Sequence, residues 1–483
     1  MTNAGLAPTQ DQSILSTNYL QWNDAAGANF ADFAQQYLPE LYEQEVERFG
    51  NRTLSGFLRM VGAEMPMTSD QVIWSEQNRL HVGYDNVDKA DNAAGTVFTV
   101  QVPLGAAPNE VVVRINQSIV VFDPASGLTL KGLVTATAND ATPAPGTFTF
   151  TAVCYTAATF GALGNSDLKV FVYGSDFAKG TEGMIGSVTP QVTQFSNRPI
   201  IIKDKYFVNG SDTAQIGWIE VATEDGTSGY LWYMKAESET RLRYEDYLEM
   251  AMVEGEKATA ASGVTVNTAA NNYGTGTEGL FASLNARGNV YSGFAGAAAP
   301  GAGALGDFDA ILQQLDLQGA IEENMLFLDR ATALDFDDMI AAQAGGGFAS
   351  TQSASYGLFD NESEMALNFG FSGFRRGSYD FYKTDWKYLN DASTRGMVTN
   401  IKGVLVPAGT STVYDQMLGS NIRRPFLHVR YRASETDDRR MKSWITGSVG
   451  GAYTSSLDAM EVHYLSERCL VTQAANNFVL FTS

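Results

Sequence analysis

The longest run of helical spacing in the chain lies at its centre, between Tyr230 and Lys257. Apolar side chains recur there at intervals of mostly three or four residues, at Leu231, Met234, Leu242, Tyr244, Leu248, Met252 and Val253. Charged side chains are spaced for pairing across one helical turn, at Glu237–Arg241 and Glu239–Arg243. The pattern predicts a continuous helix over 230–257, ~40 Å long at ~1.5 Å per residue. A helix of this length spans a flat domain instead of sitting inside a small one.

The N-terminal part of the chain is polar at first and then becomes periodic. Residues 1–28 have no clear period, which is typical of an extended arm. Asn29–Arg59 has apolar residues at helical spacing, with an acidic, amphipathic stretch at Leu41–Phe49. Residues 68–87 have the pattern of strands and turns. We therefore expect 29–87 to hold a helix followed by the start of an extended loop.

Charged residues become rare between Asp88 and Phe195, where Val, Thr, Ala, Gly and Phe dominate. Short β-forming runs such as TVFTVQV, EVVVRI and GTFTFTAV are bounded by Gly, Pro, Asn and Asp. This pattern predicts an all-β domain over 88–195, either a sandwich or a small barrel, inserted into the surrounding fold.

The C-terminal half alternates between helical and strand patterns. Residues 259–306 are rich in Ala, Gly, Asn and Thr and predict an irregular loop or a surface excursion. Residues 307–343 then predict a helix, a strand and a helix in turn, and the later runs NIKGVLVPAG and NNFVLF predict strands. Helices and strands that feed one sheet in this way indicate a mixed core, and we expect the α+β class.

The composition is strongly acidic. The chain has 32 Lys and Arg residues against 54 Asp and Glu residues, a formal net charge of −22. Because binding to the DNA backbone depends on Lys and Arg, this balance excludes a general DNA-binding protein. Hydrophobic residues make up 44% of the 483, which is enough for a core and excludes global disorder. The like charge opposes close packing of copies, so a dense assembly must pair its charges locally.

Neither a secretion signal nor a membrane-spanning run is visible in the sequence. The N-terminus lacks a basic region followed by an apolar one, and no stretch reaches ~18 apolar residues. The two cysteines, Cys154 and Cys469, cannot form a disulfide framework and favour a reducing compartment. We expect no membrane partner.

No catalytic, metal or cofactor pattern stands out. The three histidines are far apart in sequence and outside metal-ligand spacing. Gly274, Gly276 and Gly279 match the letters of a dinucleotide-binding loop, but no strand pattern precedes them, so we interpret them as part of a flexible loop. A nucleophile elbow is also lacking. We expect no enzyme activity, no cofactor and no metal site, which disfavours a hydrolase with an accessory β module.

Basic residues concentrate near the C-terminus, where seven Lys and Arg side chains fall within 20 residues. The arginines of this patch are Arg423, Arg424, Arg430, Arg432, Arg439 and Arg440. Three interpretations stay open: an exposed loop without a role, pairing with an acidic segment of a neighbouring copy, or contact with nucleic acid. The planar guanidinium suits carboxylate and phosphate alike, so the residue type does not decide between them.

Two acidic segments are candidate partners for this patch, 31–64 and 237–256. If copies of the chain associate through these charges, the candidate contacts on the acidic side are Glu43, Glu45, Glu47 and Glu237, together with Arg241 beside them.

The order of these elements resembles a tailed-phage major capsid protein of the HK97-type fold. The arm and acidic helix come first, and a β excursion at about 66–222 stands in place of the family's E-loop. The predicted helix 230–257 matches its spine helix, and 307–343 resembles its axial domain. EVHYLSERCLVTQAANNFVLF resembles the closing strand of its peripheral domain. The resemblance covers most of the chain as an arrangement of elements, without specific residue motifs. The large insertion and the overall size also resemble the crAss-like phages.

This resemblance implies a division of the chain into six parts. They are an N-terminal arm (1–28), the N-terminal helix and start of the extended loop (29–87), the all-β insertion (88–195), the return of the loop with the spine helix of the peripheral domain (196–260), the axial domain with its Gly- and Ala-rich loop (261–420), and C-terminal strands of the peripheral domain (421–483).

The function that the resemblance implies is that of a virion structural protein. Such a protein self-assembles into hexamers and pentamers of an icosahedral phage head that encloses double-stranded DNA. The implied partners are other copies, a separate scaffolding protein, a portal and auxiliary or decoration proteins, with packaged DNA held by weak local contacts only. Assembly is expected in the cytoplasm of the host bacterium. Few residues precede the first predicted helix, so we expect no self-processing, and we predict no Lys–Asn crosslink.

The alternative is another structural phage protein, such as a tail, decoration or adhesin component. The feature that favours this alternative is the β-rich middle of the chain. Such a protein should lack the long central helix, which makes residues 230–257 the discriminating segment.

Overall fold

The fold is known from a computed structural model. It describes residues 57–58, 64–77, 80–92, 95–101, 112–140, 147–156, 159–189, 192–212, 220–222, 228–259, 262–264, 274–294, 304–319, 321–336, 372–408, 410–415, 420–449 and 453–483. The chain forms two compact units, one of residues 75–195 and a larger one of residues 1–74 and 196–483. Predictions made for residues 1–56, including the N-terminal helix, lie outside the described residues.

The smaller unit is a closed barrel of six strands, all paired antiparallel. In order around the barrel they are β3 (Gly83–Asn92), β4 (Gly95–Gln101), β7 (Thr147–Cys154), β6 (Thr129–Asp140), β5 (Gln117–Phe122) and β8 (Leu168–Ser175). Alternate residues of each strand point inwards. In the interior Phe98 stacks on Phe150 with 5.2 Å between ring centroids, and Phe160, from the short helix η2 (Phe160–Ala162), meets Phe98 edge-on.

The predicted insertion 88–195 lies within this unit, which begins earlier, at residue 75. The sequence left a sandwich and a barrel open, and the structure is a barrel. The first barrel strand, β3, starts at Gly83, before the shift in composition. The sequence assigned residues up to 87 to the strands and turns that precede the insertion, whereas β3 runs from this segment into the barrel.

A buried carboxylate closes the turn between β5 and β6. Asp123 is only 2% exposed. Its oxygens accept hydrogen bonds from the backbone N–H groups of Gly164 and Ala125, each at 2.8 Å, and from the hydroxyl of Ser126 at 2.8 Å. These donors, with Gly164 contributing most, lower the pKa of Asp123 to about 2. The ionised carboxylate therefore holds two turns of the barrel together.

We expect Asp123→Asn to lower the Tm of the barrel by roughly 5 °C at neutral pH, because the amide cannot accept all of these bonds. Since the pKa is about 2 in the folded state against an ordinary value of 3.8, the stabilisation is present above about pH 4 and is lost as the pH falls towards 2. Calorimetry from about pH 2 to 7 should show this loss in the parent and not in the variant. Asp85→Asn, at a carboxylate whose side chain is 83% exposed, is the matched control. The same pH profile in parent and Asp123→Asn would contradict the role of the carboxylate.

The larger unit contains a five-stranded sheet built around one long strand. Its members are β1 (Glu64–Met67), β10 (Ile200–Asn209), β20 (Leu427–Arg432), β21 (Lys442–Gly447) and β22 (Ala459–Thr472). The first half of β22 pairs antiparallel with β10 on one side and with β21 on the other. Its second half pairs with β20, which in turn pairs in parallel with β1. Three strands therefore pair directly with β22, and β1 joins the sheet through β20.

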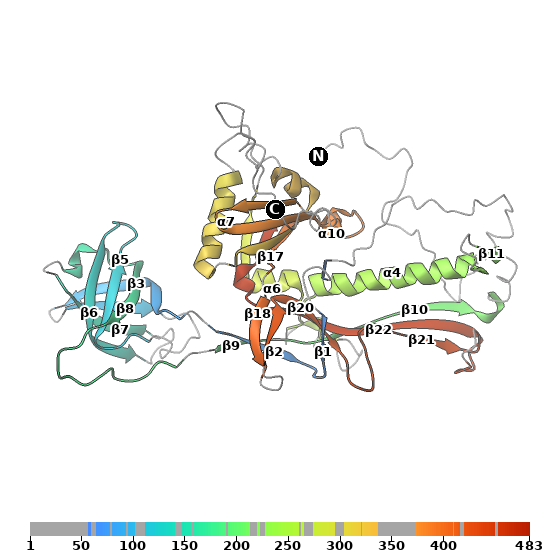
Figure 1. Ribbon diagram of the computed structural model, residues 1–483, viewed down its shortest axis with the longest axis horizontal. Helices are drawn as coiled ribbons and strands as arrows, with labels where there is room; N and C mark the ends of the chain where they lie inside the picture. The colour runs from blue at the N-terminus through green and yellow to red at the C-terminus, as the bar shows by residue number, and fades with distance from the viewer. Residues whose placement is uncertain are drawn as a thin grey trace, which may run out of the picture. The chain divides into compact units, whose positions relative to one another are not determined.

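A 24-residue helix, α4 (Leu231–Glu254), lies along β10 and β22 (Figure 1). Tyr244 and Leu248, buried on its sheet side, pack against Val462 and Tyr464 of β22, and the Tyr244 hydroxyl donates to the carbonyl of Ile202 at 3.1 Å. The helix predicted over 230–257 is confirmed with ends slightly inside that range.

The second sheet of the larger unit has six strands. In sheet order they are β13 (Asn289–Ser292), β23 (Val479–Thr482), β17 (Ile401–Pro407), β14 (Glu323–Leu328), β16 (Tyr379–Asp385) and β15 (Ser372–Arg376). Helix α7 (Ala304–Gln318) packs on one face through Phe308, Ile311 and Leu315. Because both faces of the central strand β17 are buried, its sequence IKGVLVP is almost continuously apolar.

A shared hydrophobic cluster joins the two sheets. It contains Met252 and Val253 from the end of α4, Leu427 and Val429 of β20, and Val404 and Val406 of β17 among others. A polar contact lies beside it: Glu254 accepts a hydrogen bond from the Tyr388 hydroxyl at 2.6 Å and pairs with Arg395 at 2.8 Å. Tyr388 belongs to the short helix α10 (Lys387–Asn390), and Arg395 to η3 (Arg395–Met397). The C-terminal end of the long helix is thus fixed to the six-stranded sheet.

Two expectations from the sequence need correction. Part of the predicted irregular loop 259–306 is ordered, as helix α6 (Leu280–Arg287) and strand β13. The helix has only eight residues and lies between Gly279 and Gly288, so the surrounding small residues mask its period, while Leu280 and Leu284 are fully buried.

The C-terminal run EVHYLSERCLVTQAANNFVLF is not one strand of one sheet. It supplies β22 to the five-stranded sheet and β23 to the six-stranded sheet. Between them Ala474 adopts a positive φ of 52°, and a 3-10 turn, η4 (Ala475–Asn477), redirects the chain. Residues 421–483, which the sequence assigned to the peripheral domain, therefore also supply strand β23 to the six-stranded sheet, which holds strands of the predicted axial domain.

Three strand pairs stand outside these sheets: β2 (Val72–Gln77) with β9 (Val192–Asn197), β11 (Glu220–Ala222) with β12 (Ser228–Tyr230), and β18 (Thr410–Asp415) with β19 (Ser420–Pro425). Strands β2 and β9 carry the chain out of the larger unit and back into it. Among the described helices, none is long and apolar enough to cross a membrane.

Candidate subunit interface

The structure describes only some of the predicted contact residues. Glu43, Glu45 and Glu47 lie outside the described residues. Arg423 and Arg424 are on β19, where only the backbone is described. Of the remaining candidates, Arg430 and Arg432 lie on β20, Arg439 and Arg440 lie in the loop between β20 and β21, and Glu237 and Arg241 lie on α4. They form pairs within the chain, as follows.

Glu467 of β22 is the centre of the first group of charges. Only 6% of its side chain is exposed, and it pairs with two arginines: Oε1 lies 2.8 Å from Nε of Arg432, and Oε2 lies 3.0 Å from an NH group of Arg439. Arg432 also pairs with Asp70, whose side chain is 92% exposed. One buried carboxylate therefore holds the end of β20 and the following loop against β22.

Glu64 of β1 forms the second group with Arg440 and Arg468. Its carboxylate lies 2.5 Å from Nε of Arg440 and 3.7 Å from Arg468. Arg468 donates hydrogen bonds to the hydroxyl of Ser466 at 2.9 Å and to the carbonyl of Arg440 at 2.8 Å. The Arg440 guanidinium also lies over the ring of Tyr431, 5.8 Å from its centroid.

These two groups lie on opposite faces of the sheet. Directly opposed residues of antiparallel strands share a face, and Tyr431 opposes Arg468 while Arg430 opposes Cys469. Arg430 donates to the carbonyl of Pro66 at 3.4 Å. Burial raises the pKa of the Cys469 thiol to about 12 against the opposing effect of Arg430, so this thiol stays protonated at neutral pH.

Arg430, Arg432, Arg439 and Arg440 of the basic patch therefore make contacts within the chain. Arg432 and Arg439 pair with Glu467, which the sequence had not singled out. Arg440 pairs with Glu64, the last residue of the acidic segment 31–64 that the sequence offered as a partner from a neighbouring copy. A signal existed at Glu467, since a lone acid in the strand LSERCLVT needs a partner if the strand is buried. The sequence does not indicate which charges pair, because 376 positions separate Glu64 from Arg440.

We expect Glu467→Gln to lower the free energy of unfolding by about 2 kcal/mol, because Arg439 loses its paired carboxylate and Arg432 keeps only the exposed Asp70. Asp70→Asn removes an exposed partner of the same Arg432 and should cost less than about 1 kcal/mol. Urea unfolding of the two variants measures the difference. Equal destabilisation by both would show that Glu467 has no special role.

On α4 the contacts of Arg241 and Glu237 differ from the predicted Glu237–Arg241 pair. Arg241 pairs with Glu245 at 3.4 Å, one turn towards the C-terminus. Glu237 instead faces the sheet, where its carboxylate accepts a hydrogen bond from the Tyr464 hydroxyl. Burial, with the charge of Glu237 adding to it, raises the pKa of Tyr206 to about 12. Glu237 therefore acts within the chain as a contact between helix and sheet.

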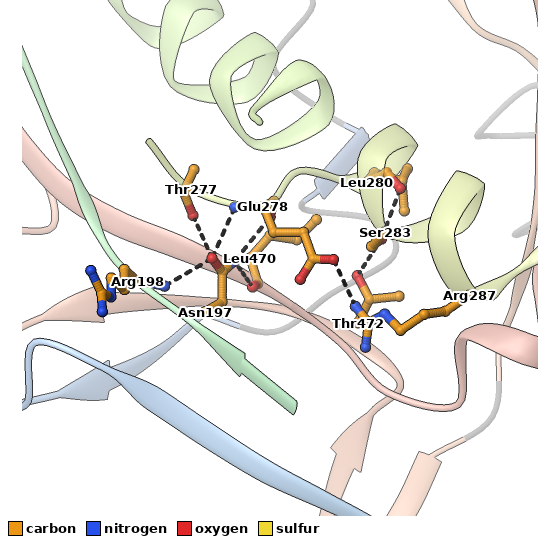
Figure 2. Close-up of polar contacts among 9 residues, drawn as sticks. All are labelled: Asn197, Arg198, Thr277, Glu278, Leu280, Ser283, Arg287, Leu470 and Thr472. Carbon is orange, nitrogen blue, oxygen red and sulfur yellow. Dashed lines mark hydrogen bonds and ion pairs between the residues drawn. The ribbon is translucent and has the colours of Figure 1, made fainter. Parts of the chain in front are cut away.

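A buried asparagine fixes the point where the chain returns from the barrel (Figure 2). Asn197, at the end of β9, is 1% exposed. Its amide nitrogen donates to the carbonyls of Leu470 at 2.7 Å and Glu278 at 2.9 Å. Its oxygen accepts from the backbone N–H of Glu278 at 2.9 Å, from the hydroxyl of Thr277 at 3.1 Å and from the N–H of Arg198 at 2.8 Å. The Asn197 side chain thus bonds to backbone groups of the segments at Glu278 and Leu470, as a neighbouring strand would.

The same region continues towards α6 through charged and hydroxyl groups (Figure 2). Glu278 pairs with Arg287 at 3.3 Å, and the Arg287 guanidinium lies 5.6 Å from the ring centroid of Trp74 on β2. The hydroxyls of Ser283 and Thr472 are 3.3 Å apart. Strands β2 and β9 are therefore anchored to α6 and β22 where they meet the larger unit.

Two of the three glycines that match a dinucleotide-binding loop have a structural role here. Gly276 has a positive φ of 72°, and Gly279 caps α6, where a Cβ atom would lie 2.5 Å from the backbone of Gly255. Among the residues that the structure describes, no group of three or more His, Cys, Asp or Glu side chains is arranged to hold a metal ion.

No family model and no curated protein sequence matches the chain. Among solved structures, it is similar to one titled Microbacterium phage Oxtober96, with a TM-score of 0.39 and 10% identity over 95% of this chain and 99% of that chain. It is also similar to the capsid of a native GTA particle computed with C5 symmetry, with a TM-score of 0.35 and 9% identity over 95% and 99% of the two chains. A third similarity is to the capsid structure of the cyanophage P-SCSP1u, with a TM-score of 0.31 and 8% identity over 64% and 80%.

Two of these titles name a capsid, the class of structure that the sequence resembles. Because none of the three TM-scores exceeds 0.39, we base the proposed function on the elements of the chain itself.

Proposed function

We propose that this chain is a phage major capsid protein of the HK97-type fold, and that it assembles into hexamers and pentamers of an icosahedral head around double-stranded DNA. The observation that carries the proposal is α4, a single 24-residue helix lying along a sheet whose strands come from distant parts of the chain. In this proposal α4 and the five-stranded sheet are the spine and the peripheral domain, and the six-stranded sheet is the axial domain.

The strand pair β2 and β9 corresponds in this proposal to the extended loop of the family, with the barrel inserted in it. The anchoring of this pair through Asn197 and Arg287 supports that assignment, because a loop that reaches a neighbouring subunit transmits force to its base.

The charge distribution supports the expected partners. A net charge of −22 repels DNA, so packaged DNA would be held only by local contacts, and close packing of copies requires local pairing of charges. We further propose a separate scaffolding protein, a portal and auxiliary capsid proteins as partners, and the virion as the location of the mature protein after assembly in the bacterial cytoplasm. The predicted contact residues remain candidates for interfaces between copies.

The second candidate, another structural phage protein such as a tail, decoration or adhesin component, shares the barrel with this proposal. It is disfavoured by the long helix, because the discriminating segment 230–257 forms α4 and not separate strands.

The experiment that tests the proposal is expression of the full chain in bacteria, alone and with a scaffolding partner, followed by velocity sedimentation and negative-stain microscopy. We expect fast-sedimenting closed shells or rings of capsomers. A chain that stays strictly monomeric at high concentration under both conditions contradicts the proposal.

A further inference from the structure

One wall of the barrel carries aromatic side chains on its outer surface. Strands β7, β6, β5 and β8 are neighbours there, and their register arranges outward-pointing residues in rows. One row runs from Tyr155, just after β7, across β6 and β5 to Phe171 of β8. Residues one position away on the strands, such as Ile119 and Val170, are buried in the interior. We call the outward-pointing side chains of this wall the aromatic face: Ser118, Val120, Lys131, Tyr155, Phe171 and Tyr173.

The three aromatic rings of this face are about half exposed. Tyr155 is 47% exposed, Phe171 50% and Tyr173 51%. Ser118 and Val120 of β5 also point outward, yet they are only 4% and 7% exposed, because their neighbours on the face cover them. The rings therefore contact the barrel with part of their surface and present the rest to solvent. Exposed apolar groups gathered in this way are typical of a binding surface.

Polar groups hold the rings and lie at their edges. The Tyr155 hydroxyl donates a hydrogen bond to the carboxylate of Asp176 at 3.3 Å and lies 2.8 Å from the hydroxyl of Ser118. The ammonium of Lys131 lies 5.9 Å from the ring centroid of Tyr173. Because Asp176 and Lys131 are both exposed, a ligand that lies on the rings has a carboxylate and an ammonium within its reach.

The charges of this region favour an uncharged ligand. The aromatic face has one cation, Lys131, and one carboxylate, Asp176, beside it. The barrel unit as a whole, residues 75–195, has ten Asp and Glu residues against six Lys and Arg residues. Because a nucleic acid requires an excess of Lys and Arg along its backbone, stacking of bases on these rings is disfavoured.

A sugar satisfies both properties of the face. One side of a sugar ring consists of C–H groups that pack against an aromatic ring, and its edge carries hydroxyls that both donate and accept hydrogen bonds. We propose that the aromatic face binds a neutral oligosaccharide. Phe171 and Tyr173 stack on its sugar rings, while Asp176 and Lys131 bond to its hydroxyls. The inference goes beyond the proposed function and does not depend on assembly.

Isothermal titration of the full chain with neutral oligosaccharides tests this site. The probes are maltohexaose, laminarihexaose, mannohexaose and xylohexaose, each titrated to millimolar concentration. We expect saturable binding of at least one of the four, with a dissociation constant in the micromolar to millimolar range. If none of the four binds, the inference is wrong.

Substitutions then locate the binding. We expect Phe171→Ala and Tyr173→Ala each to weaken binding about tenfold, because each removes a ring that stacks on the sugar. Tyr173→Phe keeps the ring and should bind within about twofold of the parent. The matched control is Tyr453→Ala, which removes a tyrosine of the larger unit that is 86% exposed and should leave the dissociation constant unchanged. The Tm of each variant verifies that it folds. Equal effects of Tyr173→Ala and Tyr453→Ala contradict the assignment to the aromatic face.

Other occupants of the face give different results. Binding of oligothymidylate that is tighter than that of every oligosaccharide, and that Tyr173→Ala removes, would identify a surface for nucleic acid and overturn the inference. Loss of association between copies in Tyr173→Ala, measured by velocity sedimentation, would identify an interface between copies and overturn it as well. Unchanged association with weakened oligosaccharide binding supports the inference. A parent chain that binds an oligosaccharide and does not assemble contradicts only the proposed function.

Discussion

Replacing Leu248 with alanine is expected to lower the free energy of unfolding of the larger unit by about 3 kcal/mol. Leu248 is 4% exposed and lies between α4 and the sheet, against Val462 and Tyr464. Its removal leaves a cavity at the middle of the contact that holds the long helix in place. Leu242, on the same helix, is 43% exposed, so Leu242→Ala should change the free energy of unfolding by less than about 0.5 kcal/mol.

Both alanine variants keep the helix propensity high, so a difference between them reports packing and not helix formation. Urea unfolding followed by circular dichroism measures it. A similar small effect of both substitutions would mean that α4 does not depend on the sheet, and the description of one rigid layer of helix and sheet would be wrong.

Replacing Asn197 with alanine is expected to cost about 3 kcal/mol or more, since it leaves several buried backbone groups of residues 278 and 470 without a partner. The matched variant Thr277→Val removes one hydrogen bond to the same side chain and should cost about 1 kcal/mol. Thermal unfolding separates the two values.

Hydrogen exchange gives a second, local measurement at Asn197. In Asn197→Ala the backbone amide of Glu278, which donates to the Asn197 oxygen at 2.9 Å, should exchange faster, as should those of β9. An unchanged exchange rate at Glu278 would contradict the assignment of Asn197 as the anchor of the returning strand.

The elements with a strong local pattern were predictable from the sequence. Helix α4 follows from its spacing and composition, and β17 follows from a continuous apolar run between two covered faces. The β character of the inserted unit follows from its uncharged, turn-bounded runs, whereas the choice between a sandwich and a barrel depends on which strands close the sheet. Such long-range pairing leaves no periodic trace within one strand.

The polar connections were not predictable for the same reason. The local sequence FSNRP indicates an ordinary turn at Asn197, yet the Asn197 side chain donates a hydrogen bond to the carbonyl of Leu470, 273 positions away. Glu467 and Glu64 pair within the chain with arginines that the sequence indicated only as candidate contacts. Helix α6 is too short for its period to emerge from a Gly- and Ala-rich background. In each case tertiary contacts decide what local composition leaves open.

We propose that α4 and its sheet form a plate that tiles with other copies into a closed shell. Cryo-electron microscopy of particles assembled from the full chain tests it most directly. The proposal predicts pentamers and hexamers in one closed lattice, with every subunit showing the 24 residues of α4 as one continuous rod along the sheet. An open tube, a stacked ring without pentamers, or a helix broken within Leu231–Glu254 would contradict it.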